Sequence, residues 1–207
     1  MMNLRLKNKI LVPMLALIIL GMGISTAISY FESKNTLENE LNKQMTQITG
    51  STTKTLSNWI RDRQLDVKSW SGEEVYQKAL KHSGMMGESF RKSANRRLAG
   101  LHENYGYYEA ISVADETGDL AVASEPSHIG RVNVKSRGYF KKSMNGEGAI
   151  SGILESKATG DPVFVISEPI NVEGKTEGAI FGVVKVNAFV SRGIDPIKIG
   201  EKGYGFA

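Results

Sequence analysis

The stretch that decides the fold is "AISGILESKATGDPVFVISEPINVEGKTEGAIFGVVKVNAFV", residues 149–190. Three apolar runs rich in β-branched residues lie within it. Thr159-Gly160 separates the first run from the second, and Glu173-Gly174 separates the second from the third; both pairs are typical of hairpin connections. The sequence therefore predicts three consecutive antiparallel strands. The three runs are residues 149–156, 161–170 and 177–190.

Two more strands are expected upstream. In "YYEAISVADETGDLAVAS", residues 107–124, apolar residues are interrupted by Asp115, Thr117 and Gly118, which predicts strand, turn and strand. "NVKSRGYFKKSMNGEG", residues 133–148, follows and is interpreted as a loop with a short helix. A long helix, two strands, a short helix and three strands indicate an α+β fold, with helices beside a five-stranded antiparallel sheet.

Helical patterns fill the region before the strands. An apolar stripe with helical spacing predicts one long helix, and Asn35 with Glu38 resembles a capping box at its start. Ser71 with Glu74 is a second helix start signal, and a third pattern ends near Asn104, where Gly106 supplies a stop. The stripe is Leu37, Leu41, Met45, Ile48, Leu56 and Trp59, and the third pattern is Phe90, Ala94, Leu98 and Leu101.

The N-terminal segment predicts a membrane anchor. Residues 10–31 carry no charge, and at 1.5 Å per residue these 22 residues span about 33 Å, enough for a hydrocarbon core of about 30 Å. Basic residues precede the segment, so the positive-inside rule places residues 1–9 in the cytoplasm and the chain after about Glu32 outside. A cleavable signal peptide has a shorter apolar core and a small-residue cleavage site, which "TAISYF" does not offer. An uncleaved signal anchor is favoured.

Composition excludes several classes of function. The chain has 26 Lys and Arg against 22 Asp and Glu, and three of the basic residues lie in the first nine positions. The remainder is close to neutral, without the concentrated basic face that nucleic-acid binding requires. The chain has no cysteine, and its three histidines are scattered. The sequence offers no nucleophile–base pair, metal cluster or phosphate loop, so we expect neither an enzyme nor a resident cofactor or metal.

Ordered features between residues 107 and 190 carry a family resemblance. They are the aspartate–glycine turn between two strands, Arg137 with Tyr139-Phe140, Gly146 after the short helix, Thr159-Gly160, Glu168-Pro169-Ile170 and "GAIFGVV" (178–184). In this order and spacing they resemble the membrane-distal half of an extracytoplasmic double Cache sensor domain, a PAS-like module of bacterial transmembrane receptors. The resemblance implies a membrane-anchored sensor, most like methyl-accepting chemotaxis receptors.

The resemblance also implies a division of the chain. The expected parts are a cytoplasmic N-terminus (1–9), a transmembrane signal anchor (10–31), a long helix and helical lead-in (32–104), a membrane-distal Cache module (105–190) and the beginning of a truncated membrane-proximal module (191–207).

Ligand-binding residues follow from the same resemblance. In the amino-acid-binding subset, an arginine and aromatic residues hold the ligand carboxylate, and Arg137, Tyr139 and Phe140 match these positions. A guanidinium offers a planar fork to a carboxylate, and aromatic rings exclude water. The alternative is structural: the two rings belong to the core, and Arg137 caps the short helix or pairs with Glu125 or Glu168.

The departures from that subset concern its acidic residues. Asn187 stands where the subset has an aspartate that holds the ligand ammonium group, and Leu154, Ser156 and Ser112 replace other family residues. Burying an amino group without an acidic partner costs several kcal/mol. We therefore expect Arg137, Tyr139, Phe140 and Asn187 to bind a small organic anion or a polar uncharged solute.

The resulting hypothesis is an extracytoplasmic small-molecule sensor that transmits its signal to the membrane through the long helix by population shift. The expected partners are the ligand, the membrane and a second copy of the chain, with dimerisation along residues 35–60. Nucleic acid is not an expected partner. The sensor region of a histidine kinase or of a cyclic-dinucleotide enzyme, and a Cache-like domain that binds nothing, are the alternatives.

Overall fold

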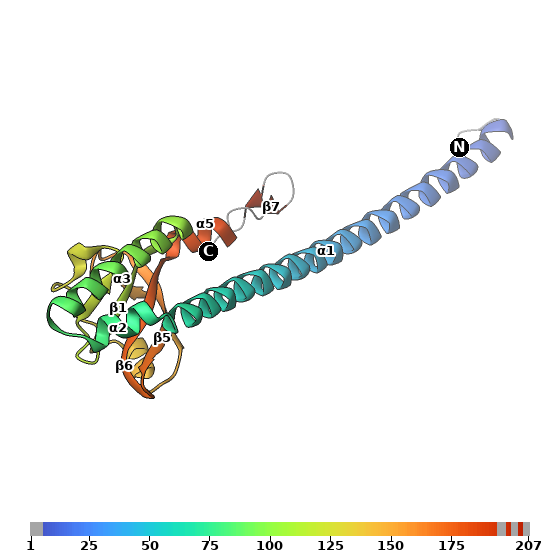
Figure 1. Ribbon diagram of the computed structural model, residues 1–207. Coiled ribbons are helices and arrows are strands. Elements are labelled where there is room, and N and C mark those ends of the chain that lie inside the picture. The colour runs from blue at the N-terminus through green and yellow to red at the C-terminus, as the bar shows by residue number, and fades with distance from the viewer. Residues whose placement is uncertain (1–5, 194–197, 200–202, 205–207) are drawn as a thin grey trace. The chain divides into compact units, whose positions relative to one another are not determined.

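The computed structural model describes residues 6–193, 198–199 and 203–204 and divides the chain into two units, residues 1–51 and 52–207 (Figure 1). The first five residues of the expected cytoplasmic segment lie outside the described residues. So does most of the expected membrane-proximal segment after residue 193. Its described residues include two short strands, β7 (Lys198–Ile199) and β8 (Gly203–Tyr204), which pair with each other.

The first unit is helical wherever it is described. It belongs to α1 (Leu6–Ser71), whose side chains between residues 10 and 31 are exposed. Among the described residues, this is the one helix long and apolar enough to cross a membrane. The helix passes through Asn35 without a break, so the predicted helix start there is wrong. An asparagine inside a helix costs less than about 1 kcal/mol, too little to interrupt a helix continued by good helix formers.

The second unit is built on one antiparallel sheet. Its strand order is β2-β1-β6-β5-β3, and β4 also pairs with β5. The predicted third strand is present as two short pieces, β3 and β4, that pair with different parts of β5, so the sheet has six strands in five positions. The strands are β1 (Tyr108–Asp115), β2 (Leu120–Ala123), β3 (Ala149–Ile150), β4 (Leu154–Glu155), β5 (Pro162–Val172) and β6 (Lys175–Lys185).

The helices of this unit largely follow the predicted pattern. Gly106 ends α3 in the left-handed region, at φ 67°, and its N–H bonds to the carbonyl of His102. Ser71 does not cap α2, because its hydroxyl donates to Lys68 O at 2.9 Å and Glu73 occupies the N-cap position. The helices are α2 (Glu74–Lys81), α3 (Gly84–Tyr105), the 3₁₀ turn η1 (Pro126–His128), α4 (Gly138–Met144) and α5 (Val186–Gly193).

The last predicted strand is too long. The sequence pattern extends it to residue 190, but β6 ends at Lys185 and α5 begins at Val186. The apolar residues of α5 explain the difference, since Ala188 and Phe189 pack against the main core from a helix. A short apolar run fits either type of element, and here the packing decides.

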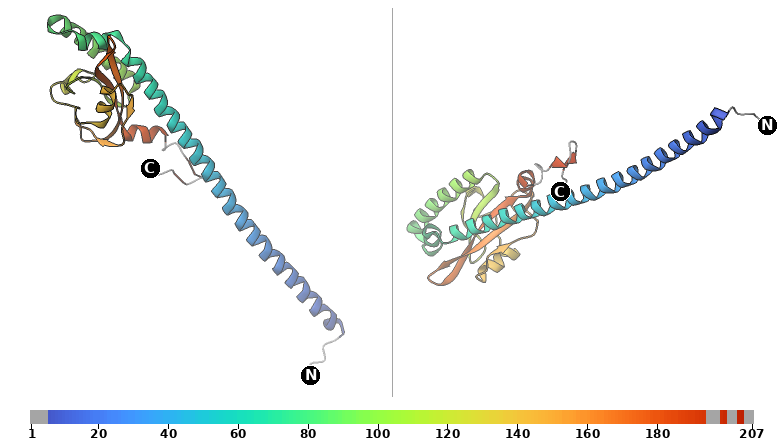
Figure 2. Two further views of the ribbon diagram at one scale, coloured as in Figure 1. Left: turned by 90° about the horizontal axis from the view of Figure 1, so that it is seen from below. Right: turned by 90° about the vertical axis from the view of Figure 1, so that its right-hand side faces the viewer.

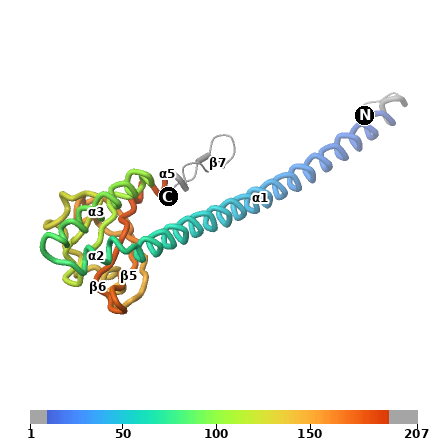
Figure 3. Tube along the Cα trace, viewed as in Figure 1, coloured from blue at the N-terminus to red at the C-terminus, as the bar shows by residue number. Residues whose placement is uncertain are grey.

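Alternation along the strands builds a core on each face of the sheet. On β5, Phe164 and Ile166 face α2 and α3, the side of the sheet that we call the helical side. Val165 between them faces α4 on the other side. The right-hand view of Figure 2 shows the green α2 and α3 on one side of β5 and β6 and the yellow-orange α4 on the other, and Figure 3 labels α2, α3, β5 and β6 along the backbone trace. The helical side forms the larger core, and the α4 side leaves room for a cavity.

Candidate functional site

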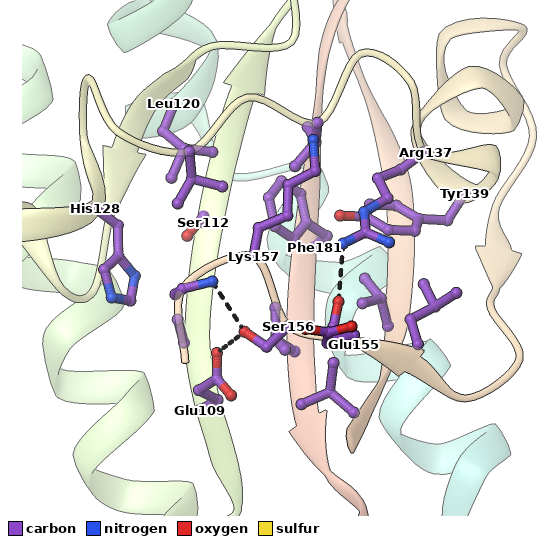
Figure 4. A pocket seen from close by; sticks show the side chains of 18 residues that line it. Glu109, Ser112, Leu120, His128, Arg137, Tyr139, Glu155, Ser156, Lys157 and Phe181 are labelled. Atoms are coloured by element: carbon purple, nitrogen blue, oxygen red, sulfur yellow. Dashed lines mark hydrogen bonds between the residues drawn. The ribbon is translucent and has the colours of Figure 1, made fainter. Parts of the chain in front are cut away.

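A cavity lies on the α4 side of the sheet (Figure 4). Its volume is about 40 Å³, which is room for a few water molecules. Apolar side chains form most of its wall, and a few polar groups point into it, as in ligand sites generally. The polar residues of the wall are Glu109, Ser112, His128, Arg137, Tyr139, Glu155, Ser156 and Lys157; the apolar ones include Leu120, Val134, Leu154, Val163, Val165 and Phe181.

Arg137 reaches this cavity from the position directly before α4. It stands at the helix N-cap, and its side chain makes no capping bond, so the guanidinium is directed elsewhere. The Nη2 group donates to the backbone carbonyl of Glu155 at 2.8 Å. Neither Glu125 nor Glu168 forms an ion pair with it among the described residues, and its side chain lines the cavity.

Glu109 is the residue that the sequence analysis missed. It lies in β1 at a bulge: Tyr108 pairs with Val184 and Ala110 with Val183, so Glu109 is the extra residue between two successive partners. A bulge re-aims a side chain, and this one directs a carboxylate that is 8% exposed toward the cavity. The available signal was a charged residue inside an apolar strand, because acidic side chains are rarely buried without a partner.

The Glu109 carboxylate holds the loop that covers the cavity, residues 155–161, which we call the strap. Ser156 Oγ donates to its Oε1 at 2.5 Å, and Thr159 Oγ1 donates to its Oε2 at 2.9 Å. At the other side of the strap, Lys157 Nζ donates to the carbonyl of Asn133 at 2.6 Å. With the Arg137 bond to Glu155, side chains tie the strap down at several points.

Tyr139 and Phe140 take different places although they are neighbours. Tyr139 lines the cavity, with its ring centroid 5.6 Å from that of Phe181. Burial raises the pKa of Tyr139 to about 12 against the opposing effect of Arg137, so its hydroxyl is neutral at physiological pH. Phe140 is 2% exposed in the core beneath α4 and does not line the cavity.

Asn187 is not brought to the cavity. It lies in the first turn of α5, and its side chain is exposed. The cause is the early end of β6, which places residue 187 in a helix rather than in the strand that the sequence analysis expected. Of the four predicted residues, Arg137 and Tyr139 therefore share the cavity.

The cavity contains acidic residues that the family resemblance did not predict. Glu109 and Glu155 both line the cavity, and in Figure 4 Glu109 and Arg137 lie on opposite sides of Ser156. Ser112 adds a hydroxyl that makes no hydrogen bond within the described part of the chain. The cavity thus combines a cation, a carboxylate and a free hydroxyl. The described residues contain no group of three or more acidic, histidine or cysteine side chains that would hold a metal ion.

Comparison with known families assigns the chain. The model of the Cache domain matches residues 33–207. Among curated proteins, no sequence matches the chain.

Solved structures with the same fold include sensor domains of two receptor types. The sensor domain of the histidine kinase DctB of V. cholerae has a TM-score of 0.64 at 19% identity, covering 74% of this chain and 59% of that one. The ligand-binding domain of the Campylobacter jejuni chemoreceptor Tlp3, in complex with 4-methylisoleucine, has a TM-score of 0.63 at 12% identity, with coverages of 74% and 62%.

A third similar structure is the ligand-binding domain of the Pseudomonas fluorescens chemoreceptor CtaA in complex with L-serine. Its TM-score is 0.58 at 13% identity, and the match covers 81% of this chain and 67% of that one. The chain spans about three fifths of the length of the DctB and Tlp3 domains.

Proposed function

This chain belongs to the Cache domain family, and on that premise we propose that it is the extracytoplasmic sensing module of a membrane-anchored chemoreceptor. Domains of this family bind ligands rather than catalyse reactions. The single observation that carries the proposal is the cavity on the α4 side of the sheet, where Arg137 and Glu109 present opposite charges to one small space.

The charges of the wall define the ligand class that we propose. Arg137 suits an anionic or hydrogen-bond-accepting group, and Glu109 with the Ser112 hydroxyl suits a hydrogen-bond donor. A small polar solute that carries both kinds of group satisfies the two sides together. Glu109 weakens the case for a purely anionic solute, because a carboxylate in the wall repels a second negative charge.

The size of the cavity implies that the strap moves when a ligand enters. About 40 Å³ is too little for a ligand of several heavy atoms, whereas cavities that hold such ligands are usually larger. The strap is the movable part of the wall, because Glu155 is its paired strand residue and side-chain hydrogen bonds attach the residues after it to Glu109 and Asn133. We propose that ligand replaces the bond between Arg137 and Glu155.

The test is a calorimetric screen of the full chain in detergent against three solute classes: carboxylic acids, uncharged polyols and amino acids. We expect binding by a solute that carries both hydrogen-bond donors and hydrogen-bond acceptors. In Arg137→Ala the affinity should fall about 10-fold or more, since a hydrogen bond to a charged group contributes about 1.5–3 kcal/mol. Arg131→Ala is the matched control: Arg131 is exposed and does not line the cavity.

Two results would overturn parts of the proposal. Binding that is unchanged in Arg137→Ala would remove this cavity as the site. Binding restricted to dicarboxylates would contradict the ligand class.

The choice of a chemoreceptor over a kinase is supported by the likeness to the Tlp3 and CtaA domains and is opposed by the likeness to DctB. Cells that carry the intact gene should swim in response to the identified ligand and lose that response when the gene is deleted. A ligand-dependent change in transcription without a swimming response would favour the kinase.

A further inference from the structure

Arg63 lies in an aromatic cage near the end of α1. The carbon at the centre of its guanidinium is 5.5 Å from the Trp59 ring, 5.5 Å from Tyr105 and 5.7 Å from Tyr107. Its Nε is 2.8 Å from an oxygen of Asp66, one turn further along the helix. Cation–π contacts and this ion pair fix a group that is only 20% exposed.

The cage joins two helices and the residue before the first strand of the sheet. Trp59 belongs to α1, Tyr105 to the end of α3, and Tyr107 directly precedes β1. The Trp59 ring also packs at 5.4 Å from Phe189 of α5 and at 5.0 Å from Tyr107. A shift of Tyr107 therefore changes the packing of α1 directly.

Tyr107, which belongs to the cage, precedes Glu109, whose carboxylate lies at the cavity, by two positions in the sequence. Tyr107 and Tyr108 pack in the core on the helical side, whereas Glu109, after them, points to the cavity on the opposite side. The bulge lies at Glu109, so the regular ladder does not hold this residue in register. Instead, the strap holds it through Ser156 and Thr159. When the strap moves, the start of β1 loses this support.

We propose that Arg63 couples the state of the cavity to α1, through Tyr107 and the bulge at Glu109. Arg63 is a positioning residue: it touches no ligand, and it makes the packing of α1 depend on the conformation at the start of β1. The inference rests on the proposed sensory role of the cavity and names the contact through which that role reaches the helix.

The experiment perturbs the cavity without a ligand. Glu109→Gln keeps the shape of the side chain and removes the charge that holds the strap. In the full chain in nanodiscs, hydrogen exchange is measured for the amides of α1 residues 56–68. We expect exchange to change about 5-fold or more in Glu109→Gln, the size of a typical coupling between sites. In an Arg63→Met background, Glu109→Gln should produce no further change.

Two variants distinguish coupling through Arg63 from a general stabilising effect of an arginine on the packing of the helices. Arg97→Met removes an arginine of α3 that is not in the cage. Two nitrogens of Arg97 donate to the Glu73 carboxylate at 2.9 and 3.0 Å. This variant should leave the effect of Glu109→Gln intact. Arg63→Lys keeps the charge and loses the planar face, so it should restore part of the effect.

Tryptophan fluorescence gives an independent readout. The chain has two tryptophans, and Trp70→Phe leaves Trp59, in the cage, as the single emitter. Its emission should respond to Glu109→Gln when Arg63 is present and not in Arg63→Met.

An effect of Glu109→Gln on α1 that is the same with and without Arg63 would overturn the proposal. If Arg63→Met does not fold, the Arg63→Lys background decides, since an undiminished effect there contradicts a role for the guanidinium face. A ligand that requires Arg137 but leaves α1 exchange unchanged would refute the coupling and leave the sensory site standing. Coupling by Glu109→Gln without ligand binding in the calorimetric screen would support the coupling and refute the sensory site.

Discussion

At the scale of single residues, Gly182 makes room for an aromatic ring. A Cβ at this position of β6 would lie 2.5 Å from a ring carbon of Tyr108, closer than real contacts allow. Tyr108 is 1% exposed and lies next to the bulged Glu109. The missing side chain at position 182 thus positions the start of β1.

Gly182→Ala should destabilise the protein by about 1–3 kcal/mol, because the ring of Tyr108 must shift within a packed core. Urea denaturation of the full chain in detergent measures the effect. The control is Gly152→Ala, in a loop where a Cβ would have no neighbour within 4 Å. Equal losses in the two variants would contradict the steric explanation.

At the scale of elements, one buried carboxylate, that of Glu109, anchors the strap at two of its residues. Ser156 Oγ also accepts bonds from the N–H groups of Ala158 and Thr159, at 3.1 and 3.3 Å. The hydroxyls of Ser156 and Thr159 therefore organise the loop and attach it to β1 at the same time. Removal of the acceptor should loosen the strap, although the bonds of Arg137 to Glu155 and of Lys157 to Asn133 remain.

Glu109→Leu should leave these two hydroxyls without their acceptor at a cost of about 1–3 kcal/mol. Amide exchange of residues 155–161 should rise more than that of β5, because the loss is local. Glu147→Leu, a change at an exposed position beyond α4, serves as the control. Uniform exchange across the strap and β5 would show that the loop does not open separately.

At the scale of the whole molecule, buried and exposed carboxyl groups give opposite pH dependences. Burial raises the pKa of Glu168, in β5, with Lys68 and Gln64 acting against the shift. The folded state thus favours the protonated form. Hydrogen bonds from Asn133 and Thr117 lower the pKa of Asp119, an exposed residue that the folded state favours in its charged form.

The signs follow from linkage. The stabilising contribution of Glu168 is complete below its ordinary pKa of 4.5 and is lost as pH rises through the raised value. Glu168→Gln should therefore gain stability relative to the unsubstituted chain as pH rises from 4.5 through the raised pKa of Glu168. Asp119→Asn should lose relative stability as pH rises through the lowered pKa of Asp119. Denaturation midpoints measured at several pH values test the predictions for the two variants. If the stability of Glu168→Gln changed with pH in parallel with that of the unsubstituted chain, the proposed contribution of Glu168 would be contradicted.

The sequence by itself determined the apolar composition of residues 10–31, the α+β order, the hairpins of the sheet and the end of α3 at Gly106. These depend on local properties: hydrophobic periodicity, turn residues and the freedom of glycine at positive φ. The resemblance also named Arg137 and Tyr139, which both line the cavity, and their role in binding a ligand stays a prediction.

Only the tertiary structure decided the rest of the site. Glu109 reaches the cavity because β1 bulges against β6, and a register shift depends on both strands. Asn187 lies outside the site because α5 packs on the core and ends β6 early. The cage around Arg63 joins residues from separate elements that are distant in sequence. Such features arise from pairing and packing between elements, which local patterns do not specify.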